Sequence, residues 1–224
     1  YPEQPLDTYL ERYRDMSEPR RSYAAMVSTT DHYIGMIMTQ LEALKLTENT
    51  IVVFMSDNGF STEEYQIEVE NHLSGYPKGH KYGTNGGGGN TGNWIGSKGS
   101  FLEGGIRVPT ILSYPSKLPS GVIRDQIITA MDWFPTILEL CNIPLPKGIE
   151  LDGHSILPLV ADTSAASAYD VLCLAWQEQW MVHEGNWKLL YNDNGGLGVA
   201  NNPKLDKIHL ANLNDTQPEV INHA

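Results

Sequence analysis

The chain has 224 residues, of which 41% are hydrophobic and 19% are charged, a composition that supports a sizeable core and argues against disorder. Acidic residues outnumber basic ones by 27 to 15, giving a formal net charge of -12 at pH 7. This balance argues against a nucleic-acid binder, which needs a basic face to displace counterions, and it requires any site for an anion to be local and metal-assisted.

The N-terminal end gives no sign of a targeting segment. Residues 1–5 have neither a basic patch nor an apolar stretch, so we expect no signal peptide there. The first residue is not methionine, and we therefore expect a mature form or a fragment. No apolar run approaches the roughly 20 residues of a membrane span.

The first long element predicted is a helix that begins after Ser17. Apolar residues from Tyr23 to Leu44 recur at spacings of three and four, which places them on one face of a helix. Ser17 is a suitable N-cap, Pro19 suits the first turn, and Asn49 marks the turn that follows. The preceding residues, 1–16, indicate an extended lead-in with a short helical turn.

A strand is predicted next, at Ile51–Met55. Its continuous apolar run is typical of strands that are buried on both faces, as in parallel sheets covered by helices. The run ends abruptly at the polar segment Ser56–Gly59. Helix, buried strand and polar loop together predict an α/β unit, and in open parallel sheets ligands collect at the carboxyl ends of strands.

A long polar loop separates this strand from the next elements. Residues 60–97 are too long for an ordinary connection in a compact domain, so we expect a functional or mobile segment. Val108–Tyr114 follows as a second strand, and Gln126–Ala130 is a further short apolar run. A helix capped by Asp132 is predicted to extend through Leu140, with Trp133, Ile137 and Leu140 directed inward.

The character of the sequence changes near residue 168. Short runs at 170–176, 180–184 and 187–191, separated by tight turns, predict a small antiparallel sheet. We therefore divide the chain into residues 1–165, an α/β part, and residues 166–224, a small β subdomain with a polar tail.

Asp57 and Asn58 are the strongest candidate ligands for a metal. A carboxylate and an amide carbonyl are hard oxygen donors, which suit Ca²⁺ or Mg²⁺. At the end of a buried strand they would be held rigidly. An ordinary turn before Gly59 explains the same residues equally well, because Asp-Asn-Gly is common turn chemistry.

Lys98 is the candidate for contact with an anionic substrate. Flanking residues Gly96 and Gly99 would let the backbone approach a ligand closely while the ammonium group meets an anionic oxygen. A solvated loop lysine is the simpler alternative. The segment is not a P-loop, because Gly99 stands where that motif requires Ser or Thr.

Other polar residues are weaker candidates. His72, His80 and Trp94 lie in the long loop and are suited to a substrate rim, although exposed loop histidines are usually only solvated. For Glu103 and Arg107 we expect a structural role, either orienting neighbouring loops or pairing with each other. The two cysteines, Cys141 and Cys173, have no metal-ligand spacing and are expected to be buried thiols.

Taken together, several ordered motifs resemble the sulfatase family. The matching stretches cover nearly the whole chain: Thr30–Gly35, Asn49–Gly59, Lys98–Pro109, Asp132–Leu138, Leu151–Ser155, Gly185–Leu189 and Leu210–Glu219. An ordered series of this length is far more specific than any single motif.

The resemblance implies a fold, a reaction and a set of site residues. The fold would be part of an alkaline-phosphatase-like α/β sandwich, with a smaller C-terminal antiparallel sheet. Asp57 and Asn58 would bind calcium, and Lys98 would be the catalytic lysine that contacts the sulfate. In such enzymes a hydrated formylglycine attacks the sulfur of an aryl or carbohydrate sulfate ester. Members are often exported to the periplasm, the extracellular space or the lysosome.

The departures from the family concern the nucleophile. The motif whose first residue matures to formylglycine, Cys-or-Ser-x-Pro-Ser-Arg, is matched by neither cysteine. Ser17 fits only superficially, since Arg20 stands where the motif has Ser and a helix start explains Ser17 and Pro19. We therefore expect the nucleophile, and the paired aspartates of the first metal-binding strand, in an N-terminal portion that would be a partner of this chain.

Three functions thus stay open at the level of sequence. The first is a sulfatase portion that acts on a small sulfate ester or a sulfated glycan, with no nucleic acid or membrane as partner. The second is a phosphomonoester or phosphodiester hydrolase of the same superfamily, and the third is an inactive binding domain on the same scaffold. If strands are missing from the central sheet, apolar surface of the long helix and of Ile51–Met55 should be uncovered.

Overall fold

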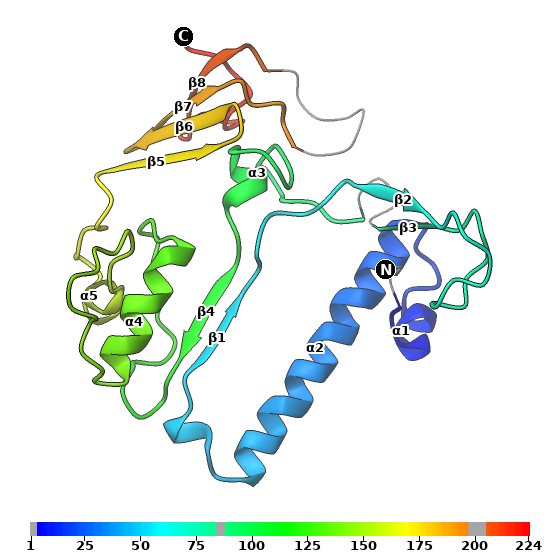
Figure 1. The fold of residues 1–224 in the computed structure, drawn as a ribbon, viewed down its shortest axis with the longest axis horizontal. Helices are drawn as coiled ribbons and strands as arrows, with labels where there is room; N and C mark the ends of the chain where they lie inside the picture. Colours follow the sequence, from blue (N-terminus) through cyan, green and yellow to red (C-terminus); the bar gives the residue numbers. More distant parts are fainter. Residues whose placement is uncertain (1–3, 84–87, 197–204) are drawn as a thin grey trace.

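The structure is a computed structural model and describes residues 4–83, 88–196 and 205–224. Its helices are α1 (Asp7–Arg12), α2 (Arg20–Ala43), α3 (Glu103–Ile106), α4 (Trp133–Leu140) and α5 (Leu157–Ala161), with short 3-10 turns η1 (Thr47–Asn49) and η2 (Ala130–Asp132). Its strands are β1 (Val52–Met55), β2 (Glu64–Gln66), β3 (Lys81–Gly83), β4 (Thr110–Ser113), β5 (Val171–Trp176), β6 (Gln179–Glu184), β7 (Trp187–Tyr191) and β8 (Ile208–Asn212). They form an α/β arrangement with three separate antiparallel sheets (Figure 1).

The long predicted helix is confirmed as α2, but its start differs from the prediction. Pro19 occupies the N-cap position and makes no side-chain cap, so the cap predicted for Ser17 is wrong. The carboxylate of Glu18 instead accepts a hydrogen bond from the amide of Ser22 at 3.1 Å. No described helix is both long enough and apolar enough to cross a membrane.

The prediction of a buried parallel strand is wrong. Strand β1 pairs antiparallel with β4 alone, in a register that sets Val52 opposite Ser113. Both central residues of β1 are exposed, Val53 by 37% and Phe54 by 41%. In the described part of the chain no further strand extends this sheet, which leaves an apolar run without the cover that such runs normally have.

Helix α4 is present as predicted, but the residues that it buries differ in part from those predicted. Leu140 is buried as predicted, whereas Ile137 is exposed, and Thr136 is buried in its place. Asp132 occupies the N-cap position of α4 as predicted, but its side chain makes no capping hydrogen bond to that helix. Its buried carboxylate instead accepts hydrogen bonds from the amides of Thr129 (2.6 Å) and His154 (2.8 Å), which fixes the loops around the helix.

The predicted C-terminal sheet is confirmed, with β8 as an additional strand. Its strands follow the order β5-β6-β7-β8, all antiparallel. One face buries Leu172, Met181 and Leu190 against Phe101 and Leu102, which stand just before α3. The hydrophobic core of the molecule thus lies where this sheet meets the α3 loop (Figure 1), and the division at residue 166 stays a prediction.

The cysteine prediction is wrong. Cys141 follows the last turn of α4 and is exposed, and Cys173 is exposed on β5. Along β5 the side chains alternate between the two faces, so Cys173 lies on the face opposite the buried Leu172. Apolar neighbours in sequence therefore did not indicate burial.

Candidate functional site

Three segments converge at the carboxyl end of β1. The amide of Gly59 donates to the carbonyl of Gly105 (2.8 Å), and the amide of Lys98 donates to the carbonyl of Phe60 (2.9 Å). The approach is so close that a Cβ on Gly59 would lie 1.8 Å from the carbonyl oxygen of Gly104. Only glycine allows such contact, so the glycines of these segments bring the polar loop after β1 against the loop that carries Lys98.

Asp57 and Asn58 occupy the tip of this strand. One carboxylate oxygen of Asp57 accepts a hydrogen bond from the amide of Asn58 (2.9 Å), and the side-chain nitrogen of Asn58 donates to the carbonyl of Gly59 (2.7 Å). These bonds form the local turn that the sequence also allowed. They leave the second carboxylate oxygen of Asp57 and the amide oxygen of Asn58 without a hydrogen bond in the described chain, as a metal would require.

The described residues supply no more than part of a metal site. Among them, no group of three or more His, Cys, Asp or Glu side chains is arranged to hold a metal. One carboxylate and one amide oxygen fit Ca²⁺ or Mg²⁺ chemically, but either ion takes six or more ligands. Asp57 is exposed, so further ligands have access to it.

Lys98 forms an ion pair with Glu63, a residue that the sequence analysis missed. The ammonium nitrogen lies 2.7 Å from the carboxylate of Glu63, which also accepts hydrogen bonds from the hydroxyls of Tyr65 (2.6 Å) and Ser61 (2.9 Å). The bond from Lys98, followed by that from Tyr65, lowers the pKa of Glu63 to about 2. The carboxylate is therefore ionised at neutral pH.

The charge on Lys98 is stabilised in turn. Its hydrogen bond to Glu63 raises the pKa of Lys98, and the nearby charge of Asp57 adds to the rise. The backbone bond to Phe60 holds Lys98 against the segment that follows the Asp57–Asn58 turn. The structure thus brings together the loops that carry the predicted metal ligands and the predicted sulfate-binding lysine.

The three predicted rim residues have contacts of their own. His72 bonds through Nδ1 to the hydroxyl of Ser74 (2.7 Å), and His80 stacks on Tyr76 with ring centroids 4.0 Å apart. The ring of Trp94 lies 4.4 Å from the guanidinium carbon of Arg107. A rim role for His72, His80 and Trp94 stays a prediction.

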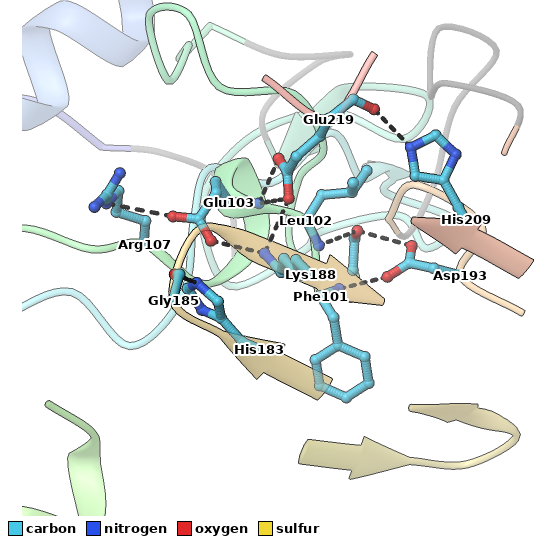
Figure 2. Close-up of polar contacts among 11 residues, drawn as sticks. Phe101, Leu102, Glu103, Arg107, His183, Gly185, Lys188, Asp193, His209 and Glu219 are labelled. Carbon is cyan, nitrogen blue, oxygen red and sulfur yellow. Dashed lines mark hydrogen bonds and ion pairs between the residues drawn. The ribbon is translucent and has the colours of Figure 1, made fainter. Parts of the chain in front are cut away.

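The expected pairing of Glu103 with Arg107 is present, within a larger buried network. Arg107 lies 3.3 Å from Glu103, and the ammonium of Lys188 lies 2.7 Å from Glu103 and 2.9 Å from Glu219. The amide of Glu103 also donates a bifurcated hydrogen bond to the two carboxylate oxygens of Glu219, at 2.9 and 3.0 Å (Figure 2). Lys188 and Glu219 are fully buried, so this network joins the C-terminal sheet to α3.

The partners in this network were missed, although the sequence carried a signal for them. Lys188 stands in the stretch Gly185–Leu189 and Glu219 ends the stretch Leu210–Glu219, both of which carry the family resemblance. Burial raises the pKa of Glu219, while Lys188 acts in the opposite direction. The carboxylate thus depends on Lys188 for its charge.

Comparison with known proteins gives a consistent result. A family model described as Sulfatase matches residues 1–143. The chain is 32% identical to human steryl-sulfatase over 75% of the chain and 28% of that protein. It is 31% identical to an uncharacterized sulfatase of Schizosaccharomyces pombe over 89% of the chain and 41% of that protein. The chain therefore spans less than half the length of these relatives.

Solved structures show the same fold. The crystal structure of Ps i-CgsB matches all of the chain and 43% of that protein, with a TM-score of 0.74 at 23% identity. A second match, with a TM-score of 0.58 at 21% identity, covers 86% of the chain and 33% of a protein solved in complex with its substrate D-glucosamine-2-N,6-O-disulfate.

Proposed function

Because the chain belongs to the sulfatase family, we propose that it carries the metal-binding and sulfate-contacting part of a sulfuric ester hydrolase. One observation supports this assignment most directly. Lys98 is tied by its backbone to Phe60, three residues after Asp57, and its pKa is raised partly by the charge of Asp57. A cation and two oxygen donors therefore lie on adjoining loops.

The proposed role of Lys98 is electrostatic. A sulfate ester is an anion, and the chain as a whole is acidic with a net charge of -12, so attraction must come from a local cation. Lys98 would donate hydrogen bonds to a sulfate oxygen or to the oxygen of the leaving group, where negative charge develops in the transition state. Its pairing with Glu63 keeps it protonated and directed.

Asp57 and Asn58 would hold a calcium ion, with magnesium as the alternative. Such an ion, when bound, would neutralise charge on the sulfate oxygens. The nucleophile, expected to be a formylglycine, and the remaining metal ligands would come from outside this chain. Asp57 and Asn58 would orient the site from the tip of β1.

We propose a sulfate ester of a small aromatic molecule or of a glycan as substrate. An arylsulfatase among the similar proteins supports the aromatic class, and the glucosamine-disulfate complex supports the glycan class. The test uses the full-length gene product with aryl and carbohydrate sulfate esters. We expect release of sulfate, and a loss of about a hundredfold or more in kcat for Lys98→Ala.

Other outcomes of this assay point to the alternatives. Phosphate esters of the same alcohols are assayed alongside the sulfate esters. Release of phosphate from them, with no sulfate from any sulfate ester, would overturn the sulfatase assignment in favour of a phosphomonoester or phosphodiester hydrolase. Release of neither would favour a binding domain that keeps the scaffold.

Metal binding is tested separately by calorimetric titration with calcium. We expect Asp57→Ala to weaken binding by at least about tenfold, because a carboxylate ligand is lost. Asp125→Ala, at an exposed aspartate away from the turn, serves as the control and should bind as the wild type does. Equal affinity in both variants would remove Asp57 from the metal site.

A further inference from the structure

The loop that carries Lys98 is anchored to the C-terminal sheet by one buried carboxylate. Asp193, two residues after β7, is only 5% exposed. Its Oδ1 accepts a hydrogen bond from the hydroxyl of Ser100 at 2.8 Å, and its Oδ2 accepts one from the amide of Phe101 at 2.6 Å (Figure 2). Asp193 therefore fastens the C-terminal sheet to the loop at Ser100 and Phe101, which are two and three residues after Lys98.

The chemistry of Asp193 explains how it can be buried. Neither a lysine nor an arginine pairs with it in the described chain, and a buried carboxylate is costly unless hydrogen bonds replace its water. The amide of Gly195 provides a third bond, at 2.8 Å to Oδ1. Hydrogen bonds to a carboxylate are stronger than those between neutral groups, so Ser100 and Phe101 are held strongly.

The loop needs such an anchor. Gly96 and Gly99 flank Lys98 closely, with φ of 88° and 89°, in a region of backbone conformation that glycine enters without strain. Two such residues give the segment many alternative conformations. On one side the amide of Lys98 is bonded to Phe60, and on the other side Asp193 holds Phe101.

We propose that Asp193 is a positioning residue for Lys98: it fixes the backbone of the loop from the C-terminal sheet, and with it the position from which the lysine side chain extends. This inference rests on the proposed function of Lys98. By this inference the C-terminal sheet contributes to the reaction, in addition to its contribution to the hydrophobic core.

The test is a double-mutant cycle in the full-length gene product, with a sulfate ester as substrate. We expect Asp193→Asn to lower kcat/KM by on the order of tenfold or more, since small displacements of a catalytic group are costly. In the background of Lys98→Ala the same substitution should cost less than about twofold, because the group that it positions is absent. Asp170→Asn, at an exposed aspartate before β5, is the matched control and should retain activity.

An equal loss in both backgrounds would overturn the proposal, since a purely structural role does not depend on Lys98. If Asp193→Asn fails to fold, Ser100→Ala takes its place in the cycle, because it removes one of the two bonds from the loop to Asp193 and leaves the bonds from the amides of Phe101 and Gly195 to that carboxylate.

Hydrogen exchange supplies a readout that needs no turnover. In Asp193→Asn the amides of both Phe101 and Lys98 should exchange on the order of tenfold faster, while those of Met181 and Leu190 in the sheet stay protected. Faster exchange at Phe101 with no change at Lys98 would mean that the anchor does not reach Lys98, and the proposal would fail. Wild type without sulfatase activity would instead defeat the proposed function, and exchange would still decide whether Asp193 holds Lys98.

Discussion

At the scale of single residues, the pair of Lys98 and Glu63 governs the electrostatics of the site. Their charges lie 2.7 Å apart, with Lys98 38% and Glu63 20% exposed at the side chain. A substrate anion that binds Lys98 must compete with Glu63 for the ammonium group. Glu63 therefore keeps the lysine charged and directed, at the cost of some affinity for the anion.

The lowered pKa of Glu63 makes a prediction about acid stability. Its pKa falls from 4.5 to about 2 on folding, so its contribution is present above about pH 4.5 and is lost as the pH falls toward 2. Glu63→Gln should remove this part of the acid dependence, which we expect to be on the order of 1 kcal/mol once the exposure of Lys98 is allowed for. Urea unfolding of both proteins between pH 5 and pH 2 measures it. Parallel stability profiles for Glu63→Gln and the wild type would contradict the prediction.

At the scale of elements, the contact between α3 and β7 depends on buried charge. Lys188 is fully buried between the carboxylates of Glu103 and Glu219. Such a triad adds little stability over an apolar core, but removal of one member leaves charges that nothing compensates. The lysine is thus the member on which both carboxylates depend.

Lys188→Met is therefore expected to destabilise the protein by about 3–5 kcal/mol. Combining it with Glu219→Gln should recover part of the loss, because one uncompensated carboxylate disappears while the side chain keeps an oxygen for the amide of Glu103. Chemical denaturation of the wild type and the variants, at neutral pH, gives these values. A change below about 1 kcal/mol for Lys188→Met would show that the triad is not important for stability.

The elements also show where sequence patterns succeed. Short runs separated by tight turns, such as the turn at Gly185 between β6 and β7, predicted this sheet, and β6 alternates buried and exposed side chains as a strand does. An apolar run such as β1 gives no such information, because burial depends on neighbours that the run itself does not specify. The same limit explains Cys173, which is surrounded by apolar residues in sequence but is exposed in the sheet.

The candidate site also contains residues that the sequence predicts and residues that it does not. Asp57, Asn58 and Lys98 carried chemistry in short motifs, and the sequence predicted them. Their supporting partners come from far along the chain: Glu63 is 35 positions from Lys98, and Asp193 is 93 positions from Ser100. No local pattern marks such partners, because only the fold brings them together.

At the scale of the whole molecule, two apolar surfaces lie open. On α2, Met36 and Ile37 are 56% and 61% exposed. In the two-stranded sheet of β1 and β4, Phe54 and Ile111 are 41% and 61% exposed. The expectation of uncovered apolar surface is thereby confirmed. Surfaces of this kind mark places for a partner, and we propose the N-terminal portion of the enzyme as that partner.

We predict that the 224-residue chain on its own self-associates and binds a hydrophobic dye. A double variant, Ile37→Lys with Ile111→Lys, should reduce both effects, since it places charge on each exposed surface. The matched control, Thr39→Lys with Ser116→Lys, adds the same two charges at exposed residues outside the two apolar sets. Sedimentation and dye fluorescence are the measurements, and a monomeric wild type that binds no dye would refute the prediction.

The bond from the amide of Glu103 to Glu219 spans 116 positions of the chain. The residues that follow β8 must therefore be synthesised before α3 gains its contact with Glu219. Contacts this distant form late and slow the search for the native state. Nascent molecules that stall before residue 219 would already contain Asp57, Asn58 and Lys98, but they would lack the contact that joins α3 to the C-terminal end of the chain.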